Sequence, residues 1–574
     1  MASLKRDKME ALLRDDGYPA AASAAPLSRT MLEEGLLSEY RLTLAIAGQK
    51  ANLYVILGIP KEADNGRLPA VLHIHGGGQT ASAPHVRHWM RRGYVGCSYD
   101  WTGPAEGRDE GRVSDLGGLP GRDIDRLDPE HSVMLTRVLL AKSVLGWLAG
   151  LEAVDPGRLG VYGISWGGSI TWLLNAWDGR LACAAPIYGV GHQLRPGHYY
   201  YSSREAHTDR ELREWESLLD GVRLAGRQLS PLLMISATND FWGWFDSVSR
   251  AMAEESPARK SLTVSANQDH HLDGCAEATL DAWMDTHLRG GSWPEEPRIE
   301  AGLSASGRLR LSAAFADEAY GGGIRQIRFV WSWGDYDAVR PPSRYWHVRE
   351  AEAGESPEAV IPVPDPEDIA IAYCDIIYAN GVKVSSLPVR ISPAYMGLKE
   401  PDSGARAACA AFAPGCRDGW QCPVYRTEPI DPDFRYRWVP DPDGGWALGL
   451  DEPDMPLCLS TTKFADPAWR WDGEAEELEL RLYSPGGGRW VFTAVRAVMQ
   501  RTERKWSCDR RLEPGWSRIR LRPGGMSDER GKPMPGWHLL ERLDVEYRAD
   551  EGCPPDAGAL LGSVNWVPSV PDTR

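Results

Sequence analysis

The sequence lacks any hydrophobic run long enough to cross a bilayer. A membrane-spanning helix needs about 20 mostly apolar residues in succession, and no stretch of the 574 residues provides them. Residues 1–10 are strongly charged and lack the apolar core of a secretory signal peptide. We therefore expect a soluble protein of the cytoplasm with no membrane partner, or a secreted one if a signal was removed.

Positive charge is outnumbered by negative charge, and cysteine usage is ordinary for a chain of this length. The 64 Lys and Arg residues stand against 80 Asp and Glu, a formal net charge of −16, whereas nucleic-acid binding requires a basic face. The ten cysteines include a loose cluster of Cys409, Cys416 and Cys422, whose spacing matches no zinc motif. The sequence thus argues against a nucleic-acid partner and predicts no metal, no cofactor and no cysteine nucleophile.

What the sequence does contain is a serine between small residues, directly after a short apolar run. Residues 159–162 lead into Gly163-Ile164-Ser165-Trp166-Gly167-Gly168, and residues 169–177 are typical of a helix. A strand, a sharp turn and a helix form a nucleophile elbow, whose strained turn leaves no room for bulky neighbours. The pattern predicts Ser165 as a nucleophile. In a chain with 60 glycines the match alone is weak, so its partners decide.

A second glycine-rich segment lies upstream of this serine. Residues 70–75 predict a buried strand that runs into Gly76-Gly77-Gly78-Gln79. Glycines expose backbone amides, and acyl transfer needs two such donors at the oxygen that becomes negative. We expect one donor from Gly77, Gly78 or Gln79 and the other from Trp166, the residue after the nucleophile. The alternative is a glycine-rich turn without chemistry.

A carboxylate and a histidine follow the serine, each just past a predicted strand. Residues 231–236 are followed by Asp240, and residues 261–265 by His270. Groups that face a ligand sit beyond the carboxyl ends of parallel strands. The order serine, acid, histidine is the order of an α/β-hydrolase triad, so we predict His270 as the general base and Asp240 as the group that orients it.

Both assignments have rivals in the sequence. Asp240 is also placed to cap the helix predicted over residues 245–255, in which case Asp246 is the competing acid. His271 competes with His270, because a loop can aim either of two adjacent side chains into a site.

With these motifs, residues from about 35 to 290 resemble α/β-hydrolases of the acetyl xylan esterase, dienelactone hydrolase and prolyl oligopeptidase neighbourhood. His75-Gly76-Gly77-Gly78, Gly163-x-Ser165-x-Gly167, Asp240 and His270 carry the resemblance. It implies a serine hydrolase that acts through a covalent acyl-enzyme and needs no metal for its chemistry. The Arg-Gly-Gln segment and His-Glu pair of the best-known acetyl esterases are absent here.

The pattern changes from alternating strands and helices to strands alone after a Gly/Pro-rich stretch at residues 289–297. We expect an α/β fold with a mostly parallel, doubly wound sheet, followed by two all-β domains of sandwich or jelly-roll type. The predicted parts are an N-terminal extension over 1–34, the hydrolase domain over 35–290, a small β-sandwich over 296–395 and a jelly-roll-like β-sandwich over 400–574.

Tryptophan is unusually frequent, with 24 Trp against 8 Phe. Flat indoles stack on sugar rings, and they fill cores equally well. Several aromatic residues fall near the predicted site or in a long segment, residues 191–227, that is typical of a lid. The predicted substrate pocket is lined by Trp101, Trp242, Trp244, Tyr199 and Tyr200.

Three functions follow from this sequence. The favoured one is a carboxylic-ester hydrolase that removes acetyl or other small acyl groups from a carbohydrate, with a small-molecule or oligosaccharide ester as partner. The second is a peptidase or amino-acid ester hydrolase, since relatives resembling cocaine esterase place a jelly roll after the hydrolase domain. The third is a non-catalytic binding protein with a degenerate hydrolase domain.

Overall fold

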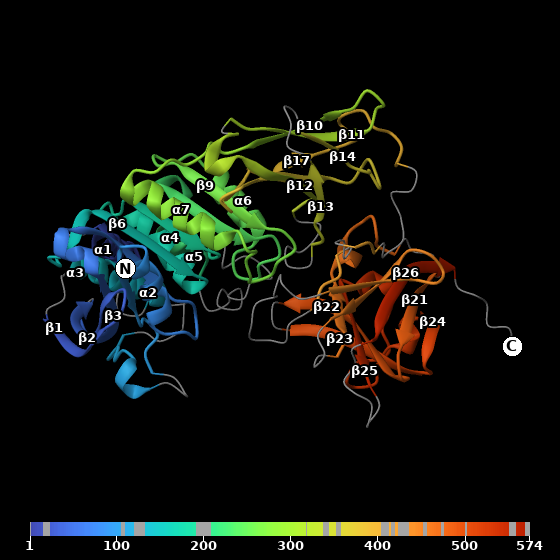
Figure 1. The fold of residues 1–574 in the computed structure, drawn as a ribbon, viewed down its shortest axis with the longest axis horizontal. Helices are drawn as coiled ribbons and strands as arrows, with labels where there is room; N and C mark the ends of the chain where they lie inside the picture. Colours follow the sequence, from blue (N-terminus) through green and yellow to red (C-terminus); the bar gives the residue numbers. More distant parts are fainter. Residues whose placement is uncertain are drawn as a thin grey trace.

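The chain folds into an α/β body and two β-sandwiches (Figure 1). The computed structural model describes residues 2–14, 23–46, 48–104, 109–119, 132–190, 208–316, 318–336, 344–351, 357–402, 412–414, 419–422, 436–451, 456–471, 476–499, 502–549 and 558–568. In Figure 1 the α/β body, blue to green, lies at the left, the first sandwich at the top, and the second, orange to red, at the right. The predicted fold class is confirmed.

A nine-stranded sheet forms the centre of the α/β body, in the order β1-β2-β3-β5-β4-β6-β7-β8-β9. Strands β5, β4 and β6 to β9 are parallel, and β1, β2 and β3 extend the sheet in antiparallel fashion. Strands β7 and β8 are buried at every position, as expected of parallel strands covered on both faces. The bounds are β1 (Ser23–Met31), β2 (Gly35–Ile46), β3 (Gln49–Pro60), β4 (Leu68–Ile74), β5 (Val95–Tyr99), β6 (Val154–Ile164), β7 (Cys183–Ile187), β8 (Leu232–Ala237) and β9 (Lys260–Ser265).

Helices cover both faces of this sheet. One hydrophobic core contains side chains of α1, α3, α4, α5 and α6, and another contains those of α2 and α7. The bounds are α1 (Ala2–Arg14), α2 (Ala83–Arg91), α3 (Val133–Ala149), α4 (Trp166–Trp177), α5 (Asp209–Leu219), α6 (Phe245–Ala253) and α7 (Ala276–Arg289). The carboxyl ends of the parallel strands therefore open onto one edge of the layered body.

The N-terminal residues belong to this body and do not form a separate extension. Helix α1 buries Met9 and Leu13 in the core, and Lys142 Nζ of α3 donates to the Leu13 carbonyl at 2.7 Å. Strand β1 pairs with β2, so the boundary predicted at residue 34 falls inside a hairpin. Every residue of β1 is exposed. The strand therefore lacks the alternation of apolar and polar residues from which a strand can be predicted.

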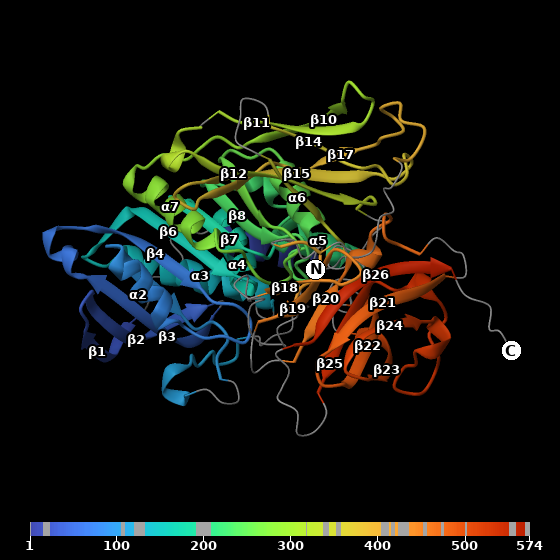
Figure 2. The same cartoon turned by 45° about the vertical axis from the view of Figure 1, so that its right-hand side comes forward.

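The first sandwich packs one sheet of β10, β11 and β14 over a second sheet of β12, β13, β15, β16 and β17 (Figure 2). The predicted hairpin at Asn380-Gly381 joins β15 to β16, with Gly381 at a φ of 87° that favours glycine. The bounds are β10 (Arg298–Leu303), β11 (Leu309–Ala314), β12 (Ile324–Trp333), β13 (His347–Ala351), β14 (Glu358–Val360), β15 (Ala370–Tyr378), β16 (Lys383–Ser385) and β17 (Val389–Ile391).

The second sandwich has its own hydrophobic core between a five-stranded and a four-stranded sheet. The predicted alternation at Leu478, Leu480 and Leu482 is confirmed, because all three side chains are buried in this core. The bounds are β18 (Tyr436–Pro440), β19 (Trp446–Leu450), β20 (Cys458–Thr461), β21 (Glu476–Ser484), β22 (Gly488–Met499), β23 (Thr502–Leu512), β24 (Gly515–Leu521), β25 (Arg542–Arg548) and β26 (Leu560–Pro568).

The α/β body and the first sandwich share a continuous core. Trp283 of α7 and Trp331 of β12 belong to the same cluster of buried side chains. Strand β16 meets β9 through side chains, since Val264 N donates to Ser385 Oγ at 3.0 Å and Lys383 Nζ donates to the Val264 carbonyl at 2.7 Å. The segment that looks like a linker in the sequence thus joins two bodies that pack as one.

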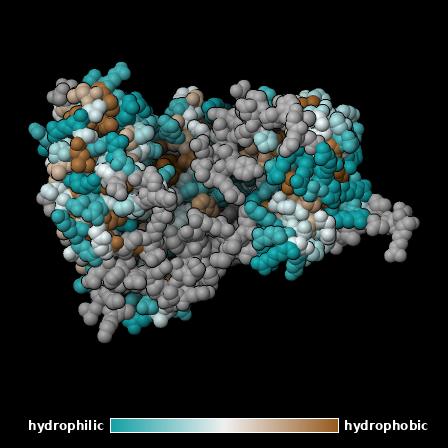
Figure 3. Space-filling model, turned by 90° about the horizontal axis from the view of Figure 1, so that it is seen from below, coloured by the Kyte–Doolittle hydropathy of each residue, from teal (hydrophilic) through white to brown (hydrophobic). Residues whose placement is uncertain are grey.

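Among the residues coloured by hydropathy in Figure 3, hydrophilic ones predominate and hydrophobic ones form small, separate patches. Within the described ranges, no helix combines the length and the apolar character needed to cross a bilayer.

Candidate active site

Ser165 occupies the predicted sharp turn between β6 and α4. The strand ends at Ile164 and the helix begins at Trp166. Ser165 has φ 59° and ψ −115°, a backbone conformation that L residues rarely adopt. Its amide donates to the Ile187 carbonyl at 2.9 Å, and its carbonyl accepts the Ser169 amide at 3.0 Å. The turn is therefore held on both sides, and the partly exposed serine sits at its apex.

The glycines around Ser165 are required by close backbone contacts. A Cβ added at Gly163 would collide with the Gly167 carbonyl, and one added at Gly167 would collide with the Ile74 carbonyl of β4. A Cβ at Gly168 would strike the Ile187 carbonyl of β7. The small residues seen in the sequence thus let α4 begin directly against two neighbouring strands, which is what an elbow of this kind needs.

The structure brings His270 and Asp240 together. His270 Nδ1 lies 2.7 Å from Asp240 Oδ2. Asp240 is fully buried, and its other oxygen accepts the amides of Trp242 and Gly243, each at 2.5 Å. The pairing commits Nδ1 to the carboxylate, which leaves Nε2 as the ring nitrogen for proton transfer.

Aromatic rings enclose the histidine. Tyr188 stacks on His270 with ring centroids 4.2 Å apart, and Phe241 lies against it at 4.6 Å. Tyr188 directly follows Ile187, whose carbonyl holds the Ser165 amide, so one short segment contacts both the serine and the histidine. Burial lowers the pKa of His270, but the charge and hydrogen bond of Asp240, aided by the charge of Asp269, outweigh it and raise the pKa above its ordinary value.

Neither of the two rival residues takes part in the contact between His270 and Asp240. Asp246 sits in the first turn of α6, where its carboxylate accepts the Ser247 amide at 2.9 Å. His271 is half-buried beside His270, and burial together with its neighbour's charge lowers its pKa. Of the two histidines, His270 is the one that contacts Asp240.

The predicted oxyanion segment faces the elbow. A Cβ added at Gly76 would lie 3.5 Å from Ser165 Cβ, and one at Gly77 would lie 2.7 Å from Trp166 Cδ1. Gly77, Gly78 and Gln79 are exposed. The Gln79 amide donates to the Gly76 carbonyl at 3.3 Å, and the Gln79 side chain accepts the Gly76 amide at 2.9 Å. The loop is thus a closed turn next to Ser165 and Trp166.

This loop is supported from beneath by His75 and Asp100, of which the sequence motif contains only His75. His75 is buried, its Nδ1 donates to the Gly76 carbonyl at 2.7 Å, and its Nε2 accepts the Trp101 amide at 3.3 Å. Asp100, also buried, lies 3.4 Å from the same Nε2 and accepts the Ser114 amide at 2.7 Å. The position of Asp100, directly after the strand β5, was the available signal.

Comparison with known proteins identifies the segment that carries these residues. Residues 49–293 match the family model of X-Pro dipeptidyl-peptidase (S15 family). This segment has an α/β-hydrolase fold. The resemblance stated from the motifs is thereby confirmed. No curated protein matches the chain.

Solved structures similar to the hydrolase include both esterases and a peptidase. An acetyl xylan esterase from Paenibacillus sp. R4 is 20% identical, covering 50% of this chain and 94% of that chain, with a TM-score of 0.41. Acetyl xylan esterase 1 from Thermoanaerobacterium sp. JW/SL YS485 is 18% identical (49% and 93%; TM-score 0.41). A puromycin-hydrolyzing peptidase of Mycobacterium tuberculosis is 16% identical (43% and 40%; TM-score 0.33). Likeness at this level does not choose between the two activities.

The predicted pocket aromatics of the hydrolase are mostly core residues. Trp101, Trp242 and Trp244 are only 3–4% exposed. The Trp166 ring lies between the first two, with centroids 5.8 Å from Trp101 and 5.0 Å from Trp242. Of these four indoles, Trp166 alone is partly exposed. The other two aromatics of the prediction, Tyr199 and Tyr200, lie outside the described residues.

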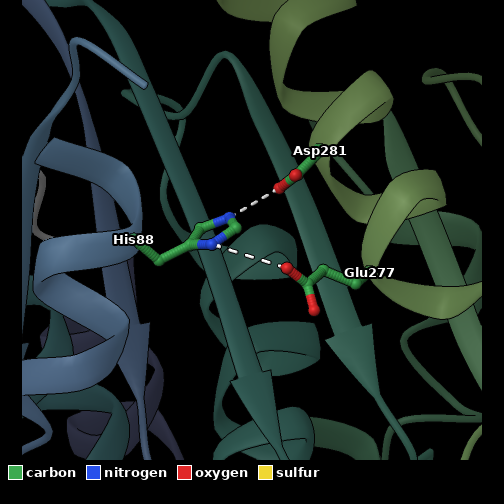
Figure 4. Close-up of side chains that lie close together, drawn as sticks. All are labelled: His88, Glu277 and Asp281. Atoms are coloured by element: carbon green, nitrogen blue, oxygen red, sulfur yellow. Dashed lines mark hydrogen bonds and ion pairs between the residues drawn. The ribbon is translucent and has the colours of Figure 1, made fainter. Parts of the chain in front are cut away.

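One cluster of the hydrolase has the composition of a metal site. His88 of α2 lies between Glu277 and Asp281 of α7 (Figure 4). However, His88 turns Nε2 to Asp281 at 2.8 Å and Nδ1 to Glu277 at 3.6 Å, so the two carboxylates face different nitrogens. Arg92 Nη1 already lies 3.0 Å from Asp281 Oδ2. This geometry is that of an ion-pair network joining α2 to α7, and one cation cannot use both nitrogens.

Proposed function

We propose that Ser165, His270 and Asp240 form a catalytic triad that hydrolyses carboxylic esters, with small acyl esters of a carbohydrate as the substrate class. The observation that carries the proposal is the 2.7 Å contact of His270 Nδ1 with buried Asp240, beside a serine in a strained elbow. The order of the three residues in the chain is that of α/β-hydrolases.

In the proposed acylation, Ser165 Oγ attacks the ester carbonyl carbon while His270 Nε2 takes the hydroxyl proton. The charge of Asp240 stabilises the imidazolium that forms. The negative oxygen of the tetrahedral intermediate accepts the Trp166 amide and an amide of the glycine loop. Since the Gln79 amide already closes the turn, Gly77 or Gly78 is the better placed second donor.

Collapse of this intermediate breaks the bond to the alcohol, which leaves with the proton from His270. Water then attacks the acyl carbon and gives its proton to the same nitrogen, and the acid leaves as Ser165 recovers its proton. No step calls for a group other than these side chains, two backbone amides and water.

A peptidase is the second candidate, favoured by the match of residues 49–293 to the X-Pro dipeptidyl-peptidase family. The same triad would serve both reactions, since amides and esters share the tetrahedral intermediate. The carbohydrate part of the first proposal rests on Trp166, whose partly exposed ring could stack on a sugar. The neighbouring indoles of Trp101 and Trp242 are buried and add no such surface.

A substrate panel with a serine control separates these candidates. Release of acid or amine is measured from p-nitrophenyl acetate, longer acyl esters, acetylated xylo-oligosaccharide and an aminoacyl-proline amide, with Ser165→Ala beside the wild type. Serine-dependent release of acetate from the oligosaccharide is the expected result. Preference for the amide would replace the esterase by the peptidase, and wild-type activity in Ser165→Ala would overturn the triad.

A further inference from the structure

The loops that carry Asp240 and His270 both contact the first sandwich through hydrogen bonds. Both loops meet residues 344–346, here called the strap, which run directly into β13. Asn239, just before the acid, and Asn267, three residues before the histidine, supply the side chains that reach it. Two loops from neighbouring strands of the hydrolase are therefore joined through a different part of the chain.

Asn267 pairs with the strap in both directions. Its Nδ2 donates to the Trp346 carbonyl at 2.6 Å, and its Oδ1 accepts the Trp346 amide at 2.9 Å. Asn267 has φ 53°, a left-handed conformation that Asn tolerates better than most residues. The Trp346 ring is buried against Phe245 and Tyr373, with centroids 5.2 Å and 5.8 Å away. The partner of Asn267 is thus fixed by core packing.

Asn239 makes the second contact and closes a ring of hydrogen bonds. Its Nδ2 donates to the Arg344 carbonyl at 2.5 Å. The buried hydroxyl of Thr238 donates to Asn239 Oδ1 at 2.7 Å and accepts the Asn267 amide at 2.8 Å. The Asn239 amide also donates to the Gln268 carbonyl at 3.0 Å. The two loops are therefore bonded to each other and, independently, to the strap.

The strap itself is held to the sandwich by a buried guanidinium. Arg344 donates to the carbonyls of Gly334 at 2.6 Å and Asp335 at 2.8 Å, which follow β12, and to that of Trp333 at 3.3 Å. Because its side chain is buried, these bonds are shielded from water. The strap can thus serve as a rigid support for the loops.

We propose that Asn267 and Asn239 are positioning residues, which use the strap of the first sandwich to align His270 with Asp240. The inference rests on the proposed function, since it concerns the same triad. A catalytic group has to be held within about 0.5 Å of its working geometry by a rigid surrounding shell, and a misplacement of about 1 Å can cost roughly 10²-fold in rate. If the two loops were bonded only to each other, no rigid element outside them would fix the position of His270 relative to Asp240.

Asn267→Gly is the sharpest test, because glycine tolerates the positive φ and the change removes the whole side chain, including the carboxamide that pairs with the strap. We expect kcat on p-nitrophenyl acetate to fall by about 10- to 100-fold with little change in KM. We also expect the acidic limb of the pH profile to move to lower pH, since His270 would lose part of its contact with Asp240. The titratable groups that face His270 are Asp240, Asp269, His271 and Tyr188, and the variant replaces none of them.

Glu296→Gln is the matched control. It weakens an ion pair of 3.1 Å with Arg259, which joins the hydrolase to the start of the same sandwich at the opposite end of β9. Wild-type kcat and pH profile are expected here. A loss of kcat in Glu296→Gln equal to that in Asn267→Gly would overturn the inference, because general loosening of the sandwich would then explain both.

Labelling by a fluorophosphonate separates failure of the inference from failure of the proposed function. If Ser165 of the wild type is labelled, and Asn267→Gly keeps its labelling rate, kcat and pH profile, the positioning role is wrong and the triad stands. If the wild type is not labelled at Ser165, the proposed function falls and the inference with it. If Asn267→Gly does not fold, Thr238→Val, which breaks the link between the two asparagines, is judged by the same kcat and pH profile.

Discussion

His347 of the first sandwich lies against Asp466 of the second, with Nε2 and Oδ2 2.7 Å apart. Asp466 is fully buried, and its other oxygen accepts the Ala468 amide at 2.7 Å. The His347 ring stacks on Trp331 with centroids 5.0 Å apart and planes 9° from parallel. The strap that meets the loops of Asp240 and His270 thus continues, one residue later, into the contact between the two sandwiches.

His347→Phe should weaken this contact between the sandwiches. Phenylalanine keeps a ring against Trp331 but leaves the buried Asp466 without its partner, and a lost bond to a charged group costs about 1.5–3 kcal/mol. The free energy of unfolding in urea would show the loss as a lower midpoint. The double variant with Asp466→Asn should recover part of the loss, because the uncompensated charge is then gone. A double variant no more stable than His347→Phe would contradict the ion-pair interpretation.

The strained backbone of Ser165 predicts that two variants with the same loss of activity differ in stability. Ser165→Gly and Ser165→Ala should both lose serine-dependent turnover by about 10⁶-fold, the scale seen when a triad nucleophile is removed. Glycine adopts a φ of 59° without a Cβ penalty, so Ser165→Gly should be more stable than Ser165→Ala by about 1 kcal/mol. Thermal unfolding of the two variants measures the difference. Equal melting temperatures would show that the turn stores no strain at this position.

The members of the proposed triad could be predicted from the sequence because each follows a strand with a clear apolar pattern. Ser165, Asp240 and His270 lie beyond the ends of β6, β8 and β9, and the structure places the last two in contact. The strap was beyond sequence reasoning, because Asn267 and Trp346 are 79 positions apart and no periodicity links a loop to a distant partner. The burial of Trp101, Trp242 and Trp244 could not be predicted for the same reason, because it depends on packing between segments that are distant in the sequence.

The raised pKa of His270 predicts the pH dependence of the reaction. The base has to be neutral to take the serine proton, so kcat/KM should rise with pH and level off only above the ordinary histidine pKa of about 6.5. The contact with Asp240 stabilises the protonated ring of His270. This contact therefore contributes to the stability of the folded protein at low pH, and the contribution is lost as pH rises through the pKa of His270 in the folded state.

Asp240→Asn should lower kcat by about 10⁴-fold and move the acidic limb of that profile to lower pH. Asp246→Asn is the matched control, because Asp246 is equally buried but contacts the Ser247 amide. Profiles of kcat/KM for the wild type and both variants decide the matter. A larger loss in Asp246→Asn than in Asp240→Asn would transfer the role of the acid to Asp246.

The ion pair of buried Lys383 with partly exposed Asp273 gives a last prediction, about the other end of the histidine loop. Lys383 of β16 is 1% exposed and donates both to the Val264 carbonyl and to Asp273. Burial raises the pKa of Asp273, but the charge and hydrogen bond of Lys383 hold it below its ordinary value. Asp273 therefore contributes stability above the pKa of the unfolded chain, and this contribution is lost as pH falls through the pKa of the folded state.

Lys383→Met keeps the volume of the side chain but removes this partner, so the pKa of Asp273 should rise and the protein should lose about 3 kcal/mol at neutral pH. The loss should shrink in mildly acidic buffer, where Asp273 of the variant takes up a proton. Urea unfolding of the wild type, Lys383→Met and the double variant with Asp273→Asn, at both pH values, measures this. The double variant should regain part of the stability at neutral pH, because Asp273 then carries no charge, whereas the buried Asp375 has still lost the nearby charge of Lys383. A loss of the same size at both pH values would mean that Lys383 stabilises the loop through the Val264 carbonyl and packing alone.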